Sequence, residues 1–444
     1  MAYRHIAGRD MGGETENSMS RTAGQNPSPR SIPRGGTPVY LVALASLIAH
    51  LLTAGRYGFH RDELYYIACG MHPAWGYVDH PALTPLLARL AVALFGGSLV
   101  GLRLLAALAA AAVIVLTGQI AREMGGGRFA SALAAVAVAV GTIFVSAGHL
   151  FQTVPFDQVV WAVAALLLAH IVARDDGAGW PWLALGATLG VGVHTKSTVV
   201  ALGVGIVAGV LLTPMRRWLR TRWPWLGALL AAAIALPNLL WQATHGWPTL
   251  AFSRNSAAAY WHGRSPALFL LLQPVFVGVG GFALACVGLW WCFSARGRRF
   301  RAFGWLFVAA VVVLLAARGK EYYPAPAYLP LIAAGGMAAT GLFRGGDRAL
   351  PAVHPRRAAR PPRPYDARRA AVRAGRGQRR ADRLAGVGRD RQRGVPTTAA
   401  RRASARANPD RELGRGGRGG LLRRAVRVAA RHQRPGLILP VGAR

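Results

Sequence analysis

The chain has 444 residues, of which 53% are hydrophobic, and its net charge is +36. Long apolar runs recur through most of it, which is typical of a multi-pass membrane protein and argues against a string of soluble domains. The charge is uneven, because residues 344–444 hold 28 arginines against 6 acidic residues. The three cysteines are too few for a disulfide framework.

Residues 1–36 are polar and rich in Gly, Ser, Pro and Arg, and we predict a disordered cytoplasmic tail. Residues 37–343 are predicted to form an all-α transmembrane bundle of about ten spans, because a lipid-exposed backbone must satisfy its own hydrogen bonds. The short run 82–97 is predicted to be a helix in the membrane interface. The predicted spans are 38–54, 102–120, 129–147, 154–173, 180–193, 197–213, 225–244, 266–293, 303–317 and 324–342.

The arginines in the short loops predict the orientation of the bundle. If the N-terminus is cytoplasmic, the four short inner loops hold eleven arginines. The longer outer loops hold eight Arg and Lys residues, so the positive-inside rule favours this orientation. It places the loop 56–100 on the non-cytoplasmic face of a plasma membrane.

That first outer loop contains an unusual concentration of polar chemistry. Residues 58–83 read GFHRDELYYIACGMHPAWGYVDHPAL and include the adjacent carboxylates Asp62 and Glu63, a third at Asp79, and His80. Ionisable side chains at a membrane boundary are costly to bury, so such a cluster is a functional hypothesis. The alternative is that each of them is a solvated loop residue.

Other charged residues fall on the same predicted face. The only two lysines among 53 basic residues, Lys196 and Lys320, both lie there, and an ammonium is not interchangeable with a guanidinium. We interpret both as phosphate ligands, with two arginines in reserve. The remaining candidates on this face are Asp157, Arg254, Arg264, Tyr322 and Tyr323.

Six motifs in order resemble glycosyltransferase family 39, which includes dolichyl-phosphate-mannose protein mannosyltransferases and lipid A aminoarabinose transferases. They are FHRDELYY, GYVDHPAL, FQTVPFDQ, HTKS, LPNLLWQATHGWPTL and GKEYYPAPAYLP, spread over about residues 38–343. The resemblance implies a C-type glycosyltransferase fold, a polyprenyl-phosphate sugar donor and an essential acidic pair. It makes Asp62 the candidate base with Glu63 beside it. It also places the motif's turn at His80-Pro81, although the second proline usual there is Ala82.

The chemistry fits these residue types. A carboxylate can deprotonate an acceptor hydroxyl, and cations can stabilise the departing lipid phosphate. Two points stay open. Tyr322 and Tyr323 either bind phosphate or sugar or belong to an interfacial aromatic belt. Asp157 either places the sugar or pairs with Lys196.

The predicted partners are a polyprenyl-phosphate sugar, membrane lipid and an acceptor glycolipid, glycan or protein, without nucleic acid. No zinc spacing such as HxxxH is present, so neither a metal nor another cofactor is predicted. A flippase for lipid-linked saccharides would require charges within the spans and an inverted repeat. A non-catalytic membrane protein would leave the acidic pair unexplained.

Residues 344–444 differ from the rest of the chain in composition. Ala, Arg, Gly and Pro dominate, and Lys is absent. We expect this tail to be disordered and interpret it as the product of a reading-frame shift near residue 343. The competing interpretation is a basic tail that binds anionic lipid or nucleic acid.

Overall fold

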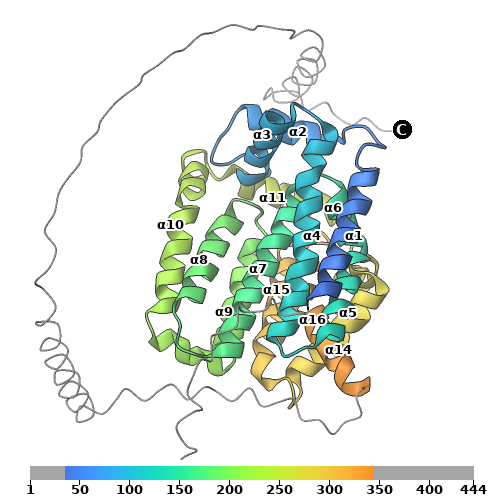
Figure 1. Cartoon of the computed structure of the whole chain (residues 1–444). Coiled ribbons are helices and arrows are strands. Elements are labelled where there is room, and N and C mark those ends of the chain that lie inside the picture. Colours follow the sequence, from blue (N-terminus) through green and yellow to red (C-terminus); the bar gives the residue numbers. More distant parts are fainter. Residues whose placement is uncertain (1–35, 344–444) are drawn as a thin grey trace, which may run out of the picture.

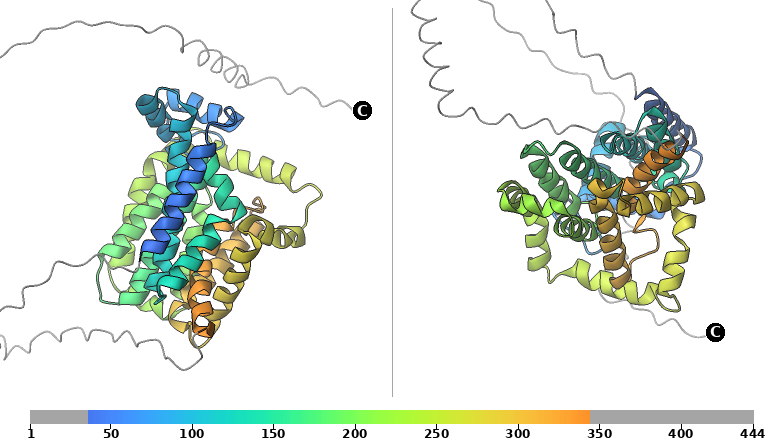
Figure 2. Two further views of the ribbon diagram at one scale, coloured as in Figure 1. Left: turned by 45° about the vertical axis from the view of Figure 1, so that its right-hand side comes forward. Right: turned by 90° about the horizontal axis from the view of Figure 1, so that it is seen from below.

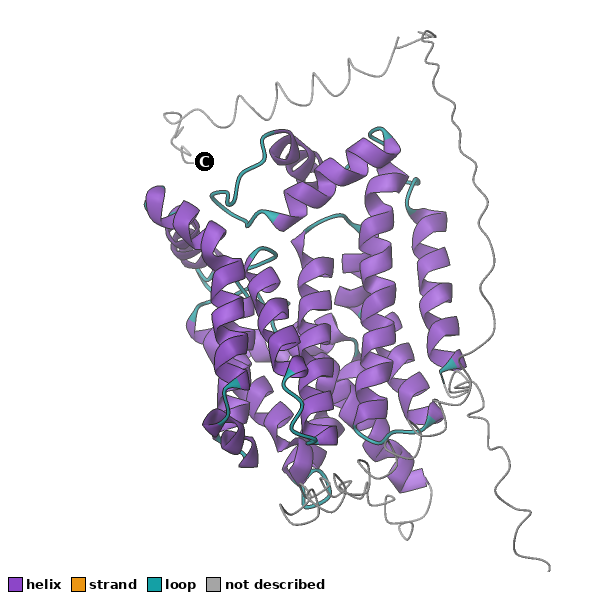
Figure 3. Ribbon diagram, turned by 60° about the vertical axis from the view of Figure 1, so that its left-hand side comes forward, coloured by secondary structure: helices purple, strands orange, loops and turns teal. Residues whose placement is uncertain are grey.

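The structure is a computed structural model that describes residues 36–343. In this part of the chain the fold is all-helical, as predicted, with no strand (Figures 1 and 3). The two predicted tails lie outside the described residues, apart from Gly36. The α-helices are α1 (Thr37–Thr53), α2 (Arg61–Met71), α3 (Leu83–Phe95), α4 (Leu99–Glu123), α5 (Arg128–Ala139), α6 (Thr142–His149), α7 (Thr153–Arg174), α8 (Trp180–Val193), α9 (Val199–Leu211), α10 (Trp223–Thr244), α11 (Pro248–Tyr260), α12 (Pro266–Leu271), α13 (Gln273–Val277), α14 (Val279–Phe293), α15 (Arg301–Ala316) and α16 (Leu329–Phe343); the 3₁₀ helices are η1 (Pro214–Arg220), η2 (Arg298–Phe300) and η3 (Ala325–Tyr328).

Small residues let the helices of the bundle approach closely. Helix α4 buries alanines on several sides and packs against α7, α1 and α5. Helices α14 and α16 cross at two glycines: a Cβ on Gly288 would lie 2.0 Å from the Leu331 carbonyl oxygen, and one on Gly335 would lie 1.9 Å from that of Leu284. Such contacts are typical of membrane helices, whose association depends on close packing because lipid is as apolar as the side chains.

Among the described residues, four helical segments are long and apolar enough to cross a membrane alone: α4, α7, α10 and the continuous stretch Arg298–Ala316. Three bent pairs bring the number to seven if each pair is one span. The apolar helices α1, α3 and α8 are shorter and are not counted among these candidate spans. Every predicted span is helical, so a multi-pass membrane protein is supported, while the count of ten stays a prediction.

The predicted span 266–293 is not one straight helix. It bends by 113° between α13 and α14, where Gly278 has a φ of 85°. Glycine adopts this conformation without steric cost, so the chain can turn sharply inside an apolar run. The predicted span 129–147 bends by 64° between α5 and α6. Hydrophobicity identified both segments but carried no information about their direction.

The helical bundle has two chemically different ends. We call one the site end: it comprises α2 and α3, which lie across the bundle at the top of Figure 1, together with residues 194–198 and 318–324. We call the other the arginine end: residues 122–128, 174–179, 214–222 and 294–301. Arg299 Nε donates to the Val172 carbonyl at 2.9 Å there, and Arg217 pairs with Asp175. The predicted inner loops therefore share one end of the molecule.

Hydrogen bonds join the first loop to the other segments of the site end. Asn238 Nδ2 on α10 donates to the Trp75 carbonyl at 2.7 Å, and the Leu83 amide donates to the His194 carbonyl at 2.8 Å. Thr249 Oγ1 on α11 donates to the Tyr77 carbonyl at 3.0 Å. Helix α11 itself buries no residue and stands away from the bundle between its two attached ends (Figure 2).

Candidate active site

The acidic pair begins helix α2, and local capping positions it. His60 is the N-cap residue in extended conformation, and its Nδ1 accepts from the Asp62 amide at 3.2 Å. The Glu63 carboxylate accepts in return from the His60 amide at 2.9 Å. This reciprocal capping box satisfies two of the free N–H groups at the helix start. Adjacent side chains on a helix diverge by about 100°, so the two carboxylates point to different surroundings.

Glu63 points into the bundle and pairs with Arg103 of α4. Arg103 Nε lies 2.8 Å from Glu63 Oε1, and Arg103 Nη2 lies 2.9 Å from Glu63 Oε2. The Glu63 side chain is 0% exposed and the Arg103 side chain 3% exposed. The amide of Phe151 also donates to Oε1 at 3.1 Å. Counting the capping bond, Glu63 accepts four hydrogen bonds, so it has little capacity left to accept a proton from a substrate.

Arg103 connects this pair to the chain before α2. Its Nη1 donates to the Ala54 carbonyl at 2.6 Å, and its Nη2 donates to the Gly58 carbonyl at 3.0 Å. Sequence reasoning missed Arg103, because it was read as part of an apolar span. A single arginine near the start of such a run was the available signal, since an intramembrane charge needs a partner.

Asp62 is in the opposite situation. Its side chain is 43% exposed, and it lies 3.4 Å from Arg61 Nε and 3.8 Å from His60 Nδ1. These contacts are longer than the charge-assisted bonds of Glu63. Asp62 therefore keeps hydrogen-bonding capacity that Glu63 lacks.

Asp79 and His80 lie beside the aromatic residues of α2. Tyr65 Oη donates to Asp79 Oδ1 at 2.7 Å, and His80 Nε2 lies 3.8 Å from the same oxygen. His80 is buried, with ring centroids 4.9 Å from Tyr66 and 4.8 Å from Tyr77. Burial lowers the pKa of His80, although the Asp79 charge opposes this shift. The buried His80 ring packs among these tyrosines in the turn that carries Asp79.

Lys196 occupies a second group of residues with the tyrosines of the loop 318–324. Its Nζ lies 4.1 Å from the ring centroid of Tyr323 and 5.1 Å from that of Tyr322. Burial lowers the pKa of Lys196 to about 8, the Asp157 charge opposes that shift, and Lys320 adds to it. Asp157 is itself buried and accepts from Thr198 Oγ1 at 2.7 Å. The structure thus brings Asp157, Lys196, Tyr322 and Tyr323 together.

A third group consists of Tyr260, Arg264, Lys320 and Glu321. Lys320 Nζ lies 5.6 Å and the Arg264 guanidinium 4.2 Å from the Tyr260 ring centroid. Glu321, 3% exposed, accepts from Arg264 Nη1 at 2.7 Å and from Tyr260 Oη. Burial raises the pKa of Glu321, but the Tyr260 and Arg264 contacts outweigh it and hold that pKa below its usual value. Arg254 lies apart from these groups, exposed on α11.

Tyr66 packs against His80, and Tyr322 packs against Lys196. Burial raises the pKa of Tyr66, and the nearby charges of Asp79 and Asp62 raise it further. Burial also raises the pKa of Tyr322, with smaller contributions from Tyr323, Tyr260 and Tyr66. The charges of two carboxylates therefore act on the Tyr66 hydroxyl. The predicted site residues other than Arg254 belong to these three groups at the site end.

The comparisons with known proteins concern the family and the fold. A family model described as dolichyl-phosphate-mannose-protein mannosyltransferase matches residues 79–241. The chain resembles glycosyltransferase family 39. The matched segment contains Asp79, His80, Asp157 and Lys196, while Asp62, Glu63 and the loop 318–324 lie outside it. No curated protein matches the chain.

Two solved structures of ArnT from Cupriavidus metallidurans share the fold. The form bound to undecaprenyl phosphate is 22% identical with a TM-score of 0.52, and the match covers 69% of this chain and 60% of that one. The apo form is 21% identical with a TM-score of 0.53, and the match covers 68% and 59%. The chain thus spans about 60% of the length of these structures.

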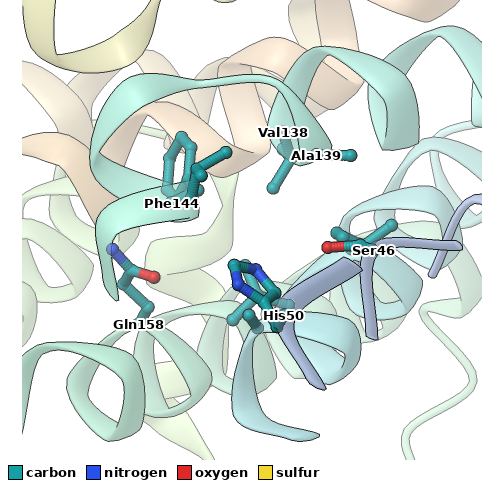
Figure 4. A pocket seen from close by; sticks show the side chains of 10 residues that line it. Ser46, His50, Val138, Ala139, Phe144 and Gln158 are labelled. Atoms are coloured by element: carbon teal, nitrogen blue, oxygen red, sulfur yellow. The ribbon is translucent and has the colours of Figure 1, made fainter. Parts of the chain in front are cut away.

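A small cavity lies inside the bundle, separate from these groups (Figure 4). It is lined by residues of α1, α4, α5, α6 and α7, including Ser46, His50 and Gln158. The buried amide of Gln158 has no hydrogen-bond partner among the described residues. Within residues 36–343, no group of three His, Cys, Asp or Glu side chains is placed to hold a metal ion.

Proposed function

We propose that this protein is a membrane glycosyltransferase that transfers a sugar from a polyprenyl-phosphate donor to an acceptor hydroxyl. One observation carries the proposal: an accessible carboxylate, Asp62, and a group of cations that includes Lys196 lie at the same end of a helical membrane bundle. The family match and the shared fold support it, and one of the similar structures is ArnT bound to undecaprenyl phosphate.

In the proposed reaction the acceptor oxygen attacks the anomeric carbon of the donor sugar. Asp62 takes the hydroxyl proton as the new carbon–oxygen bond forms. The bond from the anomeric carbon to the phosphate oxygen breaks, and its electron pair leaves with the polyprenyl phosphate. Lys196, Lys320 and Arg264 stabilise the negative charge that develops on that phosphate. A general base of this kind contributes on the order of 10² to 10⁴ in rate.

The other residues have supporting roles in this proposal. Glu63 and Arg103 hold the start of α2, so that Asp62 keeps its position relative to the donor. Tyr322 and Tyr323 bind Lys196 through their ring faces, and such cation–π contacts hold an ammonium without neutralising it. Asp79, which accepts a hydrogen bond from Tyr65, binds the sugar hydroxyls in this proposal. Asp157 balances the charge of Lys196.

We further propose that the site end lies on the non-cytoplasmic face, because the opposite end carries the arginines of the short loops. Cysteine labelling in a background without native cysteines tests this. Gly58→Cys adds a side chain where no atom lies within 4 Å, and Arg216→Cys marks the arginine end. A membrane-impermeant thiol reagent should label the first in intact cells and the second only after permeabilisation. The reverse pattern would contradict the proposed orientation.

Sugar transfer is tested with a radiolabelled polyprenyl-phosphate sugar in membranes with and without the full chain. Transfer of label to an envelope glycolipid, glycan or protein should require the chain, and polyprenyl phosphate should be released in equal amount. A flippase would instead move the intact donor across the membrane without breaking it. Donor consumption that is equal in the two membranes would refute the proposal.

A further inference from the structure

The cationic groups at the site end contain two carboxylates as well as three cations. Lys196, Lys320 and Arg264 carry three positive charges, while Asp157 and Glu321 contribute two sites for negative charge. With both carboxylates ionised, the net charge is +1. These five side chains therefore leave one positive charge that a negatively charged ligand can balance.

Glu321 is the more informative of the two carboxylates, because it occupies a position that a phosphate would take. Its Oε1 accepts from Arg264 Nη1 at 2.7 Å, and its Oε2 accepts from Tyr260 Oη. Arginine binds carboxylate and phosphate through the same donor geometry, so a phosphate and Glu321 compete for one guanidinium. The Gln273 amide also holds the Glu321 backbone carbonyl at 2.9 Å, which keeps this carboxylate in place.

The donor and the product of the proposed reaction differ in charge. A polyprenyl-phosphate sugar is a phosphodiester with a single negative charge. The released polyprenyl phosphate is a monoester, which carries roughly −1.5 to −2 at pH 7. A site with three uncompensated cations would hold the product more tightly than the donor, and tight product binding slows turnover.

We propose that Glu321 sets the charge selectivity of the phosphate site. It neutralises Arg264, so that the site holds the singly charged diester and releases the more highly charged monoester. This inference rests on the proposed function and assigns to Glu321 a specificity role that the transfer chemistry itself does not require. Asp157 balances Lys196 in the same way at the other side of the tyrosines.

The size of the effect follows from Coulomb's law. The repulsion between Glu321 and a bound phosphate is proportional to the ligand's charge. If Glu321→Gln tightens a singly charged ligand about threefold, the same change should tighten a doubly charged ligand about tenfold, because the free-energy change doubles. A purely structural role would have the opposite sign, since loss of the Arg264 contact would weaken both ligands.

The test measures binding of two lipids to the purified full chain: undecaprenyl phosphate and its methyl ester, a diester with one charge. Glu321→Gln should tighten the phosphate about tenfold and the ester about threefold, and Glu321→Asp should stay close to the wild type. Asp175→Asn removes a carboxylate from the arginine pair at the opposite end and should change neither affinity. Thermal stability in detergent identifies any variant that is poorly folded.

Each outcome decides between the two proposals. If the wild-type protein binds neither lipid, the proposed donor site is wrong, and the proposed function fails with it. If both lipids bind and Glu321→Gln weakens both, or tightens both equally, the selectivity role of Glu321 is overturned while the proposed function stands. A Glu321→Gln/Arg264→Gln double variant should lose the tightening, because it removes the cation that Glu321 neutralises.

Discussion

The two ends of the bundle hold similar ion pairs in different environments. At the arginine end, Arg217 pairs with Asp175, and the Arg217 side chain is 62% exposed. Arg174 Nη2 lies 3.8 Å from Glu123 Oε1. At the site end, the Glu63–Arg103 pair is almost completely buried, and so is Glu321. Exposed pairs contribute little to stability, whereas buried charges are costly to desolvate and need good hydrogen-bonding geometry.

This difference indicates where the chain requires fixed geometry. The arginines of the short loops need only remain on one side of the membrane, so their exact partners matter little. The charged residues of the site end must hold particular atoms in place, and burial restricts their motion. Asp62 stands out at this end, because it is half-exposed beside the buried Glu63.

Asp62→Asn should give the largest effect on activity. Asparagine keeps the size of the side chain but cannot accept a proton, so transfer should fall by at least about 10²-fold, in kcat rather than in donor affinity. Glu63→Gln should reduce transfer mainly through lower stability. Steady-state kinetics with the radiolabelled donor checks both variants. Normal kcat for Asp62→Asn, together with an inactive but stable Glu63→Gln, would reverse the two roles.

Arg103→Gln should be the most destabilising charge removal among these pairs. It leaves Glu63 buried without its partner, which costs about 3–5 kcal/mol, whereas Arg217→Gln at the arginine end should cost less than about 1 kcal/mol. Thermal unfolding of the purified proteins in one detergent measures the difference. Equal midpoints for the two variants would show that burial does not separate the two ends energetically.

Lys196→Ala and Lys320→Ala should each lower kcat/KM for the donor by roughly ten- to a hundredfold, because charge-assisted bonds to phosphate contribute about 1.5–3 kcal/mol. Arg216→Ala, an exposed cation at the arginine end, serves as the control and should have little effect. Equally small effects of all three substitutions would remove the lysines from the donor site.

The smallest expected effect is a pH dependence of donor binding. Burial lowers the pKa of Lys196 to about 8, so its charge is mostly present at pH 7 and mostly lost at pH 9. Affinity for the undecaprenyl phosphate methyl ester, whose own charge is constant, should fall a few-fold as the pH rises through about 8. Lys196→Arg should remove this decrease, because arginine stays charged. A wild-type affinity that is constant from pH 7 to pH 9 would contradict the prediction.

Local patterns in the sequence determined the helical elements and much of the site. Apolar runs predicted the helical segments of the bundle, because a span must satisfy its backbone within itself and present apolar side chains to lipid. Helices α2 and α11 lie outside the predicted spans. The loop arginines anticipated the two ends of the bundle. The clustering of polar residues in residues 58–83 pointed to Asp62, Asp79 and His80, and the two rare lysines pointed to the tyrosine group.

Only the tertiary structure decided which charges meet. Asp62 and Glu63 are neighbours in sequence, but Arg103, 40 residues after Glu63, makes one of them a buried structural residue and leaves the other accessible. Arg264 and Glu321 are 57 residues apart, and their contact lies in the proposed phosphate site. The bend at Gly278 was likewise visible only in the tertiary structure. Helix periodicity and hydropathy are local properties of the chain, whereas ion-pair partners and helix directions depend on how distant helices pack, which no single segment encodes.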